Sequence, residues 1–322
     1  MNNMQPLVSI CCITYNHAPY IRQCLDGFLM QKVTFPIEII INDDCSTDGT
    51  TDIIREYEAK YPDKIKPIYH VENEYSKGVR GMFATYCFPK AKGKYIAMCE
   101  GDDYWTDPLK LQKQVDFMEV SPEYGLVYTQ VDAFDDNGVI GPIAREIADA
   151  KSLLFGNVIA TLTVCFRREL LQSYLSDVNP IGKNWLMGDY PIWLWISHHS
   201  KIYFMNETMG RYRVLQNSAS HSADINRVVA FENSVLDIRL FYIDRFWNND
   251  KTLIEGVYAM STWYVIRLYL VNRMGRQAFR TFFERYRALS TKDRVEGLKL
   301  WLCPIKRKKM IRKWMAYTRV FN

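Results

Sequence analysis

The stretch Tyr95–Trp105, YIAMCEGDDYW, joins a short apolar run to a cluster of acidic residues. The apolar part is typical of a strand buried on both faces of a parallel sheet. Three carboxylates, on Glu100, Asp102 and Asp103, follow it directly and repel one another unless a cation compensates their charge. Because hard oxygen ligands suit Mg²⁺ or Mn²⁺, a metal site is one interpretation. A solvated acidic turn with a helix cap at Asp107 is the other.

Further buried strands are expected upstream, separated by helices. The apolar runs Leu7–Ile13, Pro36–Ile41 and Ile65–His70 fit strands. Apolar residues at helical spacing lie within 21–29, and Asp48–Asp52 supplies helix-starting residues. This βαβαβ rhythm predicts an α/β fold, a mostly parallel sheet with helices on both faces. Such sheets bind ligands beyond the carboxyl ends of their strands.

Two more acidic sites accompany the first. The segment Asn42–Thr50 follows the strand Pro36–Ile41, and its carboxylates suit hydrogen bonds to a base or ribose. The alternative is helix capping by Ser46, Thr47 or Asp48. Asp189 stands at the head of a Trp-rich helix, where it is either a cap or a catalytic group.

Composition narrows the class of protein. The chain has 322 residues, 48% of them hydrophobic, which is enough to bury a sizeable core without disulfides. None of the eight cysteines forms a C-x-x-C pair, so a reducing, cytoplasmic location is expected. We expect neither a signal peptide nor a membrane span. The sequence contains no G-x-S-x-G, P-loop or G-x-G-x-x-G motif, which disfavours hydrolases, kinases and dinucleotide-binding enzymes.

The C-terminal part differs in pattern and in charge. From Asp224 onward the chain is almost wholly helical in pattern, so we expect a catalytic domain over 1–222 and a helical region over 223–322. Residues 273–322 hold 15 Lys/Arg against 3 Asp/Glu, a net charge of +12, which leaves the body at about −7. This basic tail predicts contact with an anionic membrane, with a solvated basic helix as the alternative.

Nucleic acid is not expected as a partner, because the acidic body would oppose it. Aromatic-rich helices between Phe241 and Phe283 are a candidate homo-dimer surface.

Three motifs in order resemble family 2 glycosyltransferases: Val8–Asn16, Asp43–Thr50 and Glu100–Trp105. These are inverting enzymes of the GT-A fold (nucleotide-diphospho-sugar transferases, with a Rossmann-like sheet) that act in bacterial polysaccharide and cell-envelope synthesis. The resemblance covers roughly residues 5–220. It implies a nucleotide-sugar donor, with a UDP-sugar favoured over other nucleotide sugars, and a glycan or lipid-linked acceptor.

The resemblance also implies roles for individual residues. The nucleotide-sugar site would comprise Thr14, Tyr15, Asn16, Asp44, Glu100, Gly101 and Asp102. Asp44 would hydrogen-bond the uracil-like base, and Glu100 would face the ribose or the sugar. Asp102 would hold Mn²⁺ or Mg²⁺, with Asp103 as a second ligand or as a group that orients the acceptor. Asp189 stands at the position of the catalytic base, and the segment Tyr212–His221 resembles the loop that closes over the donor phosphates.

The chain departs from the family pattern at three places. Glu100 replaces the usual first Asp of the metal motif, and Gly188 precedes Asp189 where a Glu is common. Ala84 and Thr85 stand where an Arg-Asn pair is usual. Lys77 or Arg80 would be the source of a compensating positive charge.

The implied reaction is a metal-assisted single displacement in which Asp189 deprotonates the acceptor hydroxyl. A nucleotidyltransferase also uses paired carboxylates and a divalent metal, but Thr14–Pro19 has no basic phosphate-binding residue. A catalytically lapsed nucleotide- or glycan-binding protein is the non-enzymatic alternative.

Overall fold

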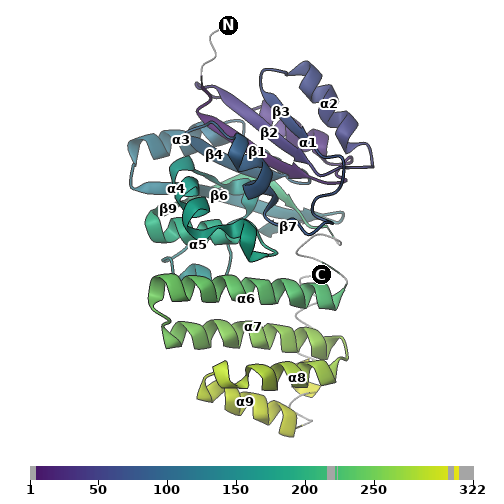
Figure 1. Cartoon of the computed structure of the whole chain (residues 1–322), viewed down its shortest axis with the longest axis vertical. Helices are drawn as coiled ribbons and strands as arrows, with labels where there is room; N and C mark the ends of the chain where they lie inside the picture. The colour runs from purple at the N-terminus through teal and green to yellow at the C-terminus, as the bar shows by residue number, and fades with distance from the viewer. Residues whose placement is uncertain (1–4, 216–221, 223, 304–307, 312–322) are drawn as a thin grey trace. The chain divides into compact units, whose positions relative to one another are not determined.

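The structure is a computed structural model that describes residues 5–215, 222, 224–303 and 308–311. The chain forms two compact units, residues 1–215 and 216–322. The expected domain boundary, between residues 222 and 223, lies in a segment of which only residue 222 is described. The first unit contains the sheet, and the second contains the helices α6 to α9 (Figure 1).

Four parallel strands form one half of the sheet, in the order β3-β2-β1-β4. Their bounds are β1 Val8–Thr14, β2 Ile37–Asp43, β3 Ile65–Tyr69 and β4 Tyr95–Glu100. The apolar side chains of β1 and β4 are buried, apart from a partly exposed Ile13, as expected for central strands covered on both faces. The βαβ prediction for this half is confirmed.

The other half of the sheet is mixed. It consists of β5 Tyr104–Trp105, β6 Tyr124–Asp135, β7 Gly138–Pro142, β8 Cys165–Arg167 and β9 Lys201–Arg213. β8 runs antiparallel to both β4 and β6, while β6 and β9 are parallel. β5 is antiparallel to β9, and β7 is antiparallel to β6. The expectation of a mostly parallel sheet therefore holds for the first half only, because strands as short as β5 and β8 leave no readable periodicity.

Five helices belong to the first unit within its described residues: α1 Ile21–Leu29, α2 Thr50–Lys60, α3 Lys110–Val120, α4 Arg168–Val178 and α5 Tyr190–His199. Short helical turns lie at Ser152–Phe155, Thr161–Thr163 and Pro180–Lys183. Between β3 and β4 the chain forms only a π-helical turn, Phe83–Cys87, followed by a 3₁₀ turn, Phe88–Lys90. Pro89 has no N–H to continue the helical hydrogen bonds.

One close approach joins α1 to the strand after the acidic cluster. A Cβ on Gly27 would lie 3.0 Å from the backbone nitrogen of Trp105 and 3.1 Å from its carbonyl oxygen. The Trp105 ring, only 2% exposed, meets the Phe28 ring edge-on at 4.8 Å between centroids. Glycine at position 27 therefore lets the α1 backbone touch β5, which fixes the end of the acidic turn.

The second unit is helical within its described residues, with α6 Ile225–Trp247, α7 Lys251–Val271, α8 Gly275–Arg285, a 3₁₀ turn Tyr286–Ala288 and α9 Thr291–Leu302. α6, α7 and α8 lie side by side (Figure 1). Asp224, Asp250 and Ser290 cap α6, α7 and α9 by accepting backbone N–H groups. Of the helices described, none combines the length and the apolar character that a membrane crossing requires.

Candidate active site

The strands β1, β2 and β4, which lead into the segments expected to bind the donor, end side by side. Thr14, the last residue of β1, is in register with Asp43 at the end of β2. Ile13 is in register with Glu100 at the end of β4. The parallel half of the sheet therefore brings the segments after β1, β2 and β4 to one edge, where open α/β sheets bind their ligands.

The turn after β1 is tied to the loop after β2. Asn16 adopts a φ of 54°, in the left-handed region that Asn tolerates. Its N–H donates to Ser46 Oγ at 2.9 Å, and its Oδ1 accepts the Thr47 N–H at 2.8 Å. Asn16 therefore braces two loops. Of the expected pocket residues on this turn, Thr14 is buried and Tyr15 is 45% exposed.

Two of the carboxylates after β2 serve the local backbone. Asp48 accepts the Thr50 N–H at 3.0 Å at the start of α2, which is the capping role that the sequence left open. Its other oxygen accepts the Ala18 N–H at 2.9 Å. Asp43 accepts hydrogen bonds from the Ser46 N–H and from the Thr51 hydroxyl. These bonds shape the loops around the site.

Asp44 holds a further segment over the strand ends. One carboxylate oxygen accepts the Glu74 N–H at 2.7 Å, and the other accepts the Tyr75 N–H at 3.1 Å. The Asn73 side chain donates to the Asp44 carbonyl at 3.0 Å. Arg80 in turn lies over the Tyr75 ring at 4.3 Å. Each Asp44 oxygen keeps a second lone pair, so the predicted bond to a base remains open to it.

The turn after β4 needs a glycine. A Cβ on Gly101 would lie 2.6 Å from Thr14 Oγ1 and 3.0 Å from His17 Nδ1. Both of those atoms are buried, and neither has a hydrogen-bond partner within the part of the chain that the structure describes. Buried polar atoms without a partner are uncommon and point to a missing partner such as a ligand.

Arg213, the last residue of β9, organises the acidic turn. Its N–H donates to Asp103 Oδ1 at 2.7 Å, and its Nε donates to the Asp102 carbonyl at 2.9 Å. A third bond, 3.1 Å long, joins the guanidinium to Gln23 of α1, and the Tyr20 ring lies 4.3 Å beneath it. Asp103 is 2% exposed and bonded to backbone, whereas no hydrogen bond to the Asp102 carboxylate is found among the described residues.

Asp189 is both a helix cap and a neighbour of Glu100. One of its oxygens accepts the Tyr190 N–H at 2.8 Å at the start of α5, and the other accepts the Thr161 hydroxyl at 3.0 Å. A Cβ on Gly188 would lie 3.5 Å from Gly81 Cα, so the start of α5 also borders the segment that Asp44 anchors.

Electrostatics tie the acidic side chains together. Burial, together with the charges of Asp189 and Asp102, raises the pKa of Glu100 to about 8. Burial, followed by the charges of Asp102 and Glu100, raises the pKa of Asp103 well above its usual range. Burial also raises the pKa of Asp189, against hydrogen bonds from Tyr190 and Thr161 that lower it. Carboxylates from β4 and α5 therefore share one site with too little positive charge.

The residues fit a divalent cation in their chemistry. Carboxylate oxygens are hard ligands, and Asp102 has a carboxylate that no described residue occupies. Within the described residues, no three His, Cys, Asp or Glu side chains form a ready group for a metal ion. An ion held by Asp102, with or without Asp103, would complete its shell with water and substrate phosphate, as Mg²⁺ commonly does.

Sequence reasoning missed Thr161 entirely. It lies on a helical turn, Thr161–Thr163, between stretches without clear periodicity, and no motif marks it. The closing-loop prediction, Tyr212–His221, is covered only to residue 215, because residues 216–221 lie outside the described part. Lys77 pairs with Glu72 and Glu74 rather than with the acidic turn.

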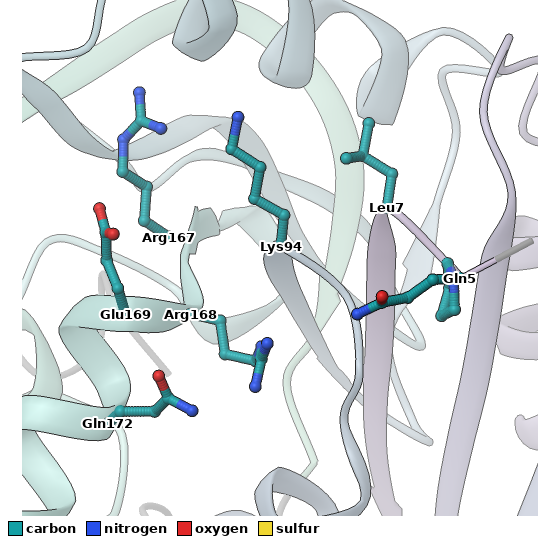
Figure 2. Close-up of a pocket in the computed structure, with 8 residues that line it drawn as sticks. Gln5, Leu7, Lys94, Arg167, Arg168, Glu169 and Gln172 are labelled. Carbon is teal, nitrogen blue, oxygen red and sulfur yellow. The ribbon is translucent and has the colours of Figure 1, made fainter.

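Two cavities are described, one away from these carboxylates and one beside Asp43. One, of about 470 Å³, lies where β1 and β4 begin, with Arg167 and Arg168 on one side and Gln5 and Leu7 on the other (Figure 2). Its cations are engaged: for example, Arg168 Nε donates to the Gly93 carbonyl at 2.6 Å. This cavity is at the opposite edge of the sheet from the acidic turn. The other, of about 330 Å³, lies beyond β2 and β3 and includes Asp43 and Arg55 in its lining.

Comparison with known proteins agrees with this arrangement. Residues 9–187 match Glycosyl transferase family 2. An uncharacterised protein of Mycobacterium tuberculosis is 38% identical over 225 residues, which are 68% of this chain and 62% of that protein. The chain thus matches a little under two thirds of the length of this relative. WfaP of Escherichia coli, a UDP-Glc:alpha-D-GlcNAc-diphosphoundecaprenol beta-1,3-glucosyltransferase, is 42% identical over 114 residues, 35% of this chain and 41% of WfaP.

A solved structure supports the fold. The first 349 residues of Staphylococcus aureus TarS, in complex with UDP-GlcNAc, align with a TM-score of 0.57 at 16% identity. The alignment covers 88% of this chain and 92% of that one, so the two share the GT-A fold. With the family match spanning more than half of its residues, the chain belongs to glycosyl transferase family 2.

Proposed function

We propose that this protein transfers a sugar from a nucleotide-diphosphate donor, a UDP-sugar, to a hydroxyl of a glycan or lipid-linked acceptor, with inversion at the anomeric carbon. One observation carries the proposal. The carboxylate of Glu100, at the end of β4, is coupled in charge both to Asp102, two residues later, and to Asp189, at the start of α5. Such an arrangement suits a donor phosphate on one side and a base on the other.

The donor site would be built from the ends of β1, β2 and β4. Thr14 Oγ1 is buried beside Gly101 and lacks a described partner, so a ribose or base would satisfy it. Tyr15 is exposed enough to cover a nucleotide, and Asn16 holds the turn in shape. Asp44 would accept a bond from the base through a free lone pair. TarS was solved with UDP-GlcNAc and WfaP is named for UDP-Glc, which favours uridine.

The proposed reaction is one displacement. The acceptor oxygen forms a bond to the anomeric carbon as the bond from that carbon to the diphosphate breaks, and the hydroxyl proton passes to Asp189. General-base help of this kind contributes roughly 10²–10⁴ in rate. Mn²⁺ or Mg²⁺, held by Asp102 with Asp103 beside it, would supply Lewis-acid stabilisation of the departing diphosphate. Arg213 would keep the acidic turn in place through its bonds to Asp102 and Asp103.

The raised pKa of Asp189 agrees with a base role. Burial raises this pKa, which makes the carboxylate more basic than an exposed one, while the Thr161 hydroxyl opposes the shift. A base works best when its pKa approaches the working pH. Glu100, whose pKa is raised to about 8, would face the ribose or the sugar and add hydrogen bonding there.

The deciding variant is Asp189→Asn. Asn keeps the cap of α5, so the fold should hold while UDP release from a UDP-sugar falls by at least about 10²-fold and UDP binding stays within about threefold. Asp250→Asn is the matched control, because Asp250 caps α7 in the same way. This variant should change neither UDP release nor UDP binding. Full activity in Asp189→Asn would remove Asp189 from the base role.

The donor and the reaction class are tested together. A thermal-shift screen of nucleoside diphosphates and nucleotide sugars with Mn²⁺ should give the largest rise for a uridine compound. Ligand at 100 times its Kd adds about 2.7 kcal/mol of stability. Release of UDP supports glycosyl transfer, and release of pyrophosphate would indicate a nucleotidyltransferase instead. A protein that binds UDP-sugars but never hydrolyses or transfers them would be the lapsed binding protein.

We also propose that the protein works at the cytoplasmic face of an anionic membrane, which would suit a lipid-linked acceptor. On α8, Arg276, Phe279, Arg280 and Phe283 follow the spacing i, i+3, i+4, i+7 and so share one face. Phe279 is 47% exposed and Phe283 is 44% exposed. Aromatic side chains among basic ones are typical of a helix that lies in a bilayer interface. Residues 304–307 and 312–322 of the basic tail lie outside the described residues.

Vesicle co-sedimentation tests the membrane proposal. The wild type should pellet with phosphatidylglycerol vesicles and much less with phosphatidylcholine vesicles, and Phe279→Ser/Phe283→Ser should weaken pelleting several-fold. Val139→Ser/Ile140→Ser on the exposed strand β7 is the control, since it removes comparable apolar surface elsewhere. Equal pelleting of the wild type and both variants would contradict the proposal that this face of α8 binds the membrane. The homo-dimer expected from Phe241–Phe283 stays a prediction for gel filtration.

A further inference from the structure

The turn Thr161–Thr163 presents a hydroxyl to Asp189. Thr161 donates to Asp189 Oδ2 at 3.0 Å and is 7% exposed, and Thr163 is 1% exposed. The turn is closed by the Thr163 N–H, which donates to the Ala160 carbonyl at 3.0 Å. A single 3₁₀ turn of this kind has few internal bonds, so its position depends on what surrounds it.

Two side chains from elsewhere in the chain hold this turn by its carbonyls. Trp105 Nε1 donates to the Leu162 carbonyl at 2.8 Å, and Gln114 Nε2 donates to the Thr163 carbonyl at 2.8 Å. Trp105 follows the acidic turn by two residues, and Gln114 lies on α3. The turn is therefore fixed directly to the segment that carries Asp102 and Asp103.

Lys110 sets the orientation of the Gln114 amide. Its Nζ donates to Gln114 Oε1 at 2.9 Å and lies 4.3 Å from the Trp105 ring centre. Because an ammonium group only donates, the amide oxygen must face Lys110 and the amide nitrogen must face the carbonyls. Gln114 Nε2 also donates to the Val127 carbonyl at 3.1 Å, and both Lys110 and Gln114 are 0% exposed.

We propose that Trp105 and Gln114, with Lys110 behind them, are positioning residues that hold the Thr161–Thr163 turn so that the Thr161 hydroxyl fixes the orientation of the Asp189 carboxylate. No described hydrogen bond joins the side chains of these three residues to Asp189 or to the acidic side chains. They act through the turn. This proposal rests on the proposed function, in which Asp189 is the base.

The test compares Gln114→Met and Trp105→Phe with the wild type. Gln114→Met removes the donor to the turn with a side chain of similar length, and Trp105→Phe removes it with a smaller aromatic ring. Gln130→Met is the matched control, because Gln130 also bonds backbone on another segment, through its donor to the Ala144 carbonyl at 2.9 Å. Amide hydrogen exchange of a peptide containing Leu162 and Thr163 should speed up about tenfold or more in the two test variants and stay unchanged in the control.

Turnover separates positioning from general loss of structure. With UDP-GlcNAc and Mn²⁺, kcat for UDP release should fall by roughly 10- to 100-fold in Gln114→Met while KM changes less than about threefold, since a misplaced catalytic group lowers rate at unchanged binding. Thr161→Val should cause a similar fall, and Thr161→Ser, which keeps the hydroxyl, should restore most of the activity. Combining Gln114→Met with Thr161→Val should add little to either single change.

Outcomes against the proposal are distinct from failure of the proposed function. Unchanged exchange at Leu162 and Thr163 in Gln114→Met overturns it whatever the donor. Fully additive kcat effects in the double variant also overturn it. If Asp189→Asn keeps full activity, the base assignment fails. If Asp189→Asn is inactive while Gln114→Met matches Gln130→Met, only the positioning role fails.

Discussion

Lys110 is a fully buried cation whose removal has a calculable effect on stability. It has no carboxylate partner among its described hydrogen bonds, only Gln114 Oε1 and the face of Trp105. Burial lowers the pKa of this ammonium from 10.5 to about 8. The folded protein therefore releases this proton at a lower pH than the unfolded chain does, and stability depends on pH in that interval.

The sign and size follow from that shift. Between pH 8 and 10.5 the unfolded chain binds more protons at this group, so stability rises with pH across the interval. A pKa shift of this size corresponds to about 3 kcal/mol, because each unit is worth about 1.4 kcal/mol. Below pH 8 the full cost of burying the charge is present, and above 10.5 it has disappeared.

The perturbation is Lys110→Met, measured by urea unfolding from pH 7 to 10.5. At pH 7 the variant loses the bond to Gln114, which costs about 1–3 kcal/mol, and gains relief from the buried charge, so its stability should be close to the wild type. As pH rises, the wild type should gain about 3 kcal/mol relative to Lys110→Met. Lys113→Met is the control, because Lys113 is paired with Asp107 and Glu207. This variant keeps Lys110, so the wild type should show no such gain relative to it. If the free energies of unfolding of the wild type and of Lys110→Met change with pH in parallel, the buried charge of Lys110 does not set this pH dependence.

Three further predictions concern the candidate site. Gly101→Ala should destabilise the fold by about 1–3 kcal/mol in urea unfolding, because the new Cβ would lie 2.6 Å from Thr14 Oγ1; a neutral effect would mean that the turn yields easily. Asp44→Ala should release the Glu74–Tyr75 segment, seen as faster proteolysis there, and unchanged cleavage would show that other contacts hold it. Arg213→Lys should lower activity at least tenfold with small loss of stability, since Lys lacks the planar fork that bonds two partners; full activity would contradict that role.

Much of the fold follows from local pattern. The runs that became β1, β2 and β4 are apolar apart from Ser9, Glu38 and the polar residues at their ends, and a strand covered on both faces needs such a run. Pairing is not local, however. β8 has only three residues, Cys165–Arg167, and pairs antiparallel with β4. A strand that short is specified by its neighbours rather than by its own periodicity.

The candidate site divides in the same way. Carboxylates at strand ends can be found from sequence because their position follows from the strand that precedes them, as for Glu100 and Asp102. Whether a carboxylate is free or bonded cannot be found in that way. Asp43 and Asp44 are neighbours with similar surroundings in sequence, yet one serves the start of α2 and the other anchors residues 74 and 75. Thr161 has no sequence signal, because its role depends on a contact 28 residues away in the chain.

The sequence by itself determined the acidic turn Glu100–Asp103 at the end of a buried strand, the alternation of strands and helices that leads to it, and the family resemblance. Only the tertiary structure decided which groups stand around that turn. Arg213 reaches it from β9, and the charge of Asp189, at the start of α5, acts on Glu100. The physical reason is range: burial patterns and turn chemistry act over a few residues, whereas charge coupling and hydrogen bonding depend on distances that only the folded chain sets.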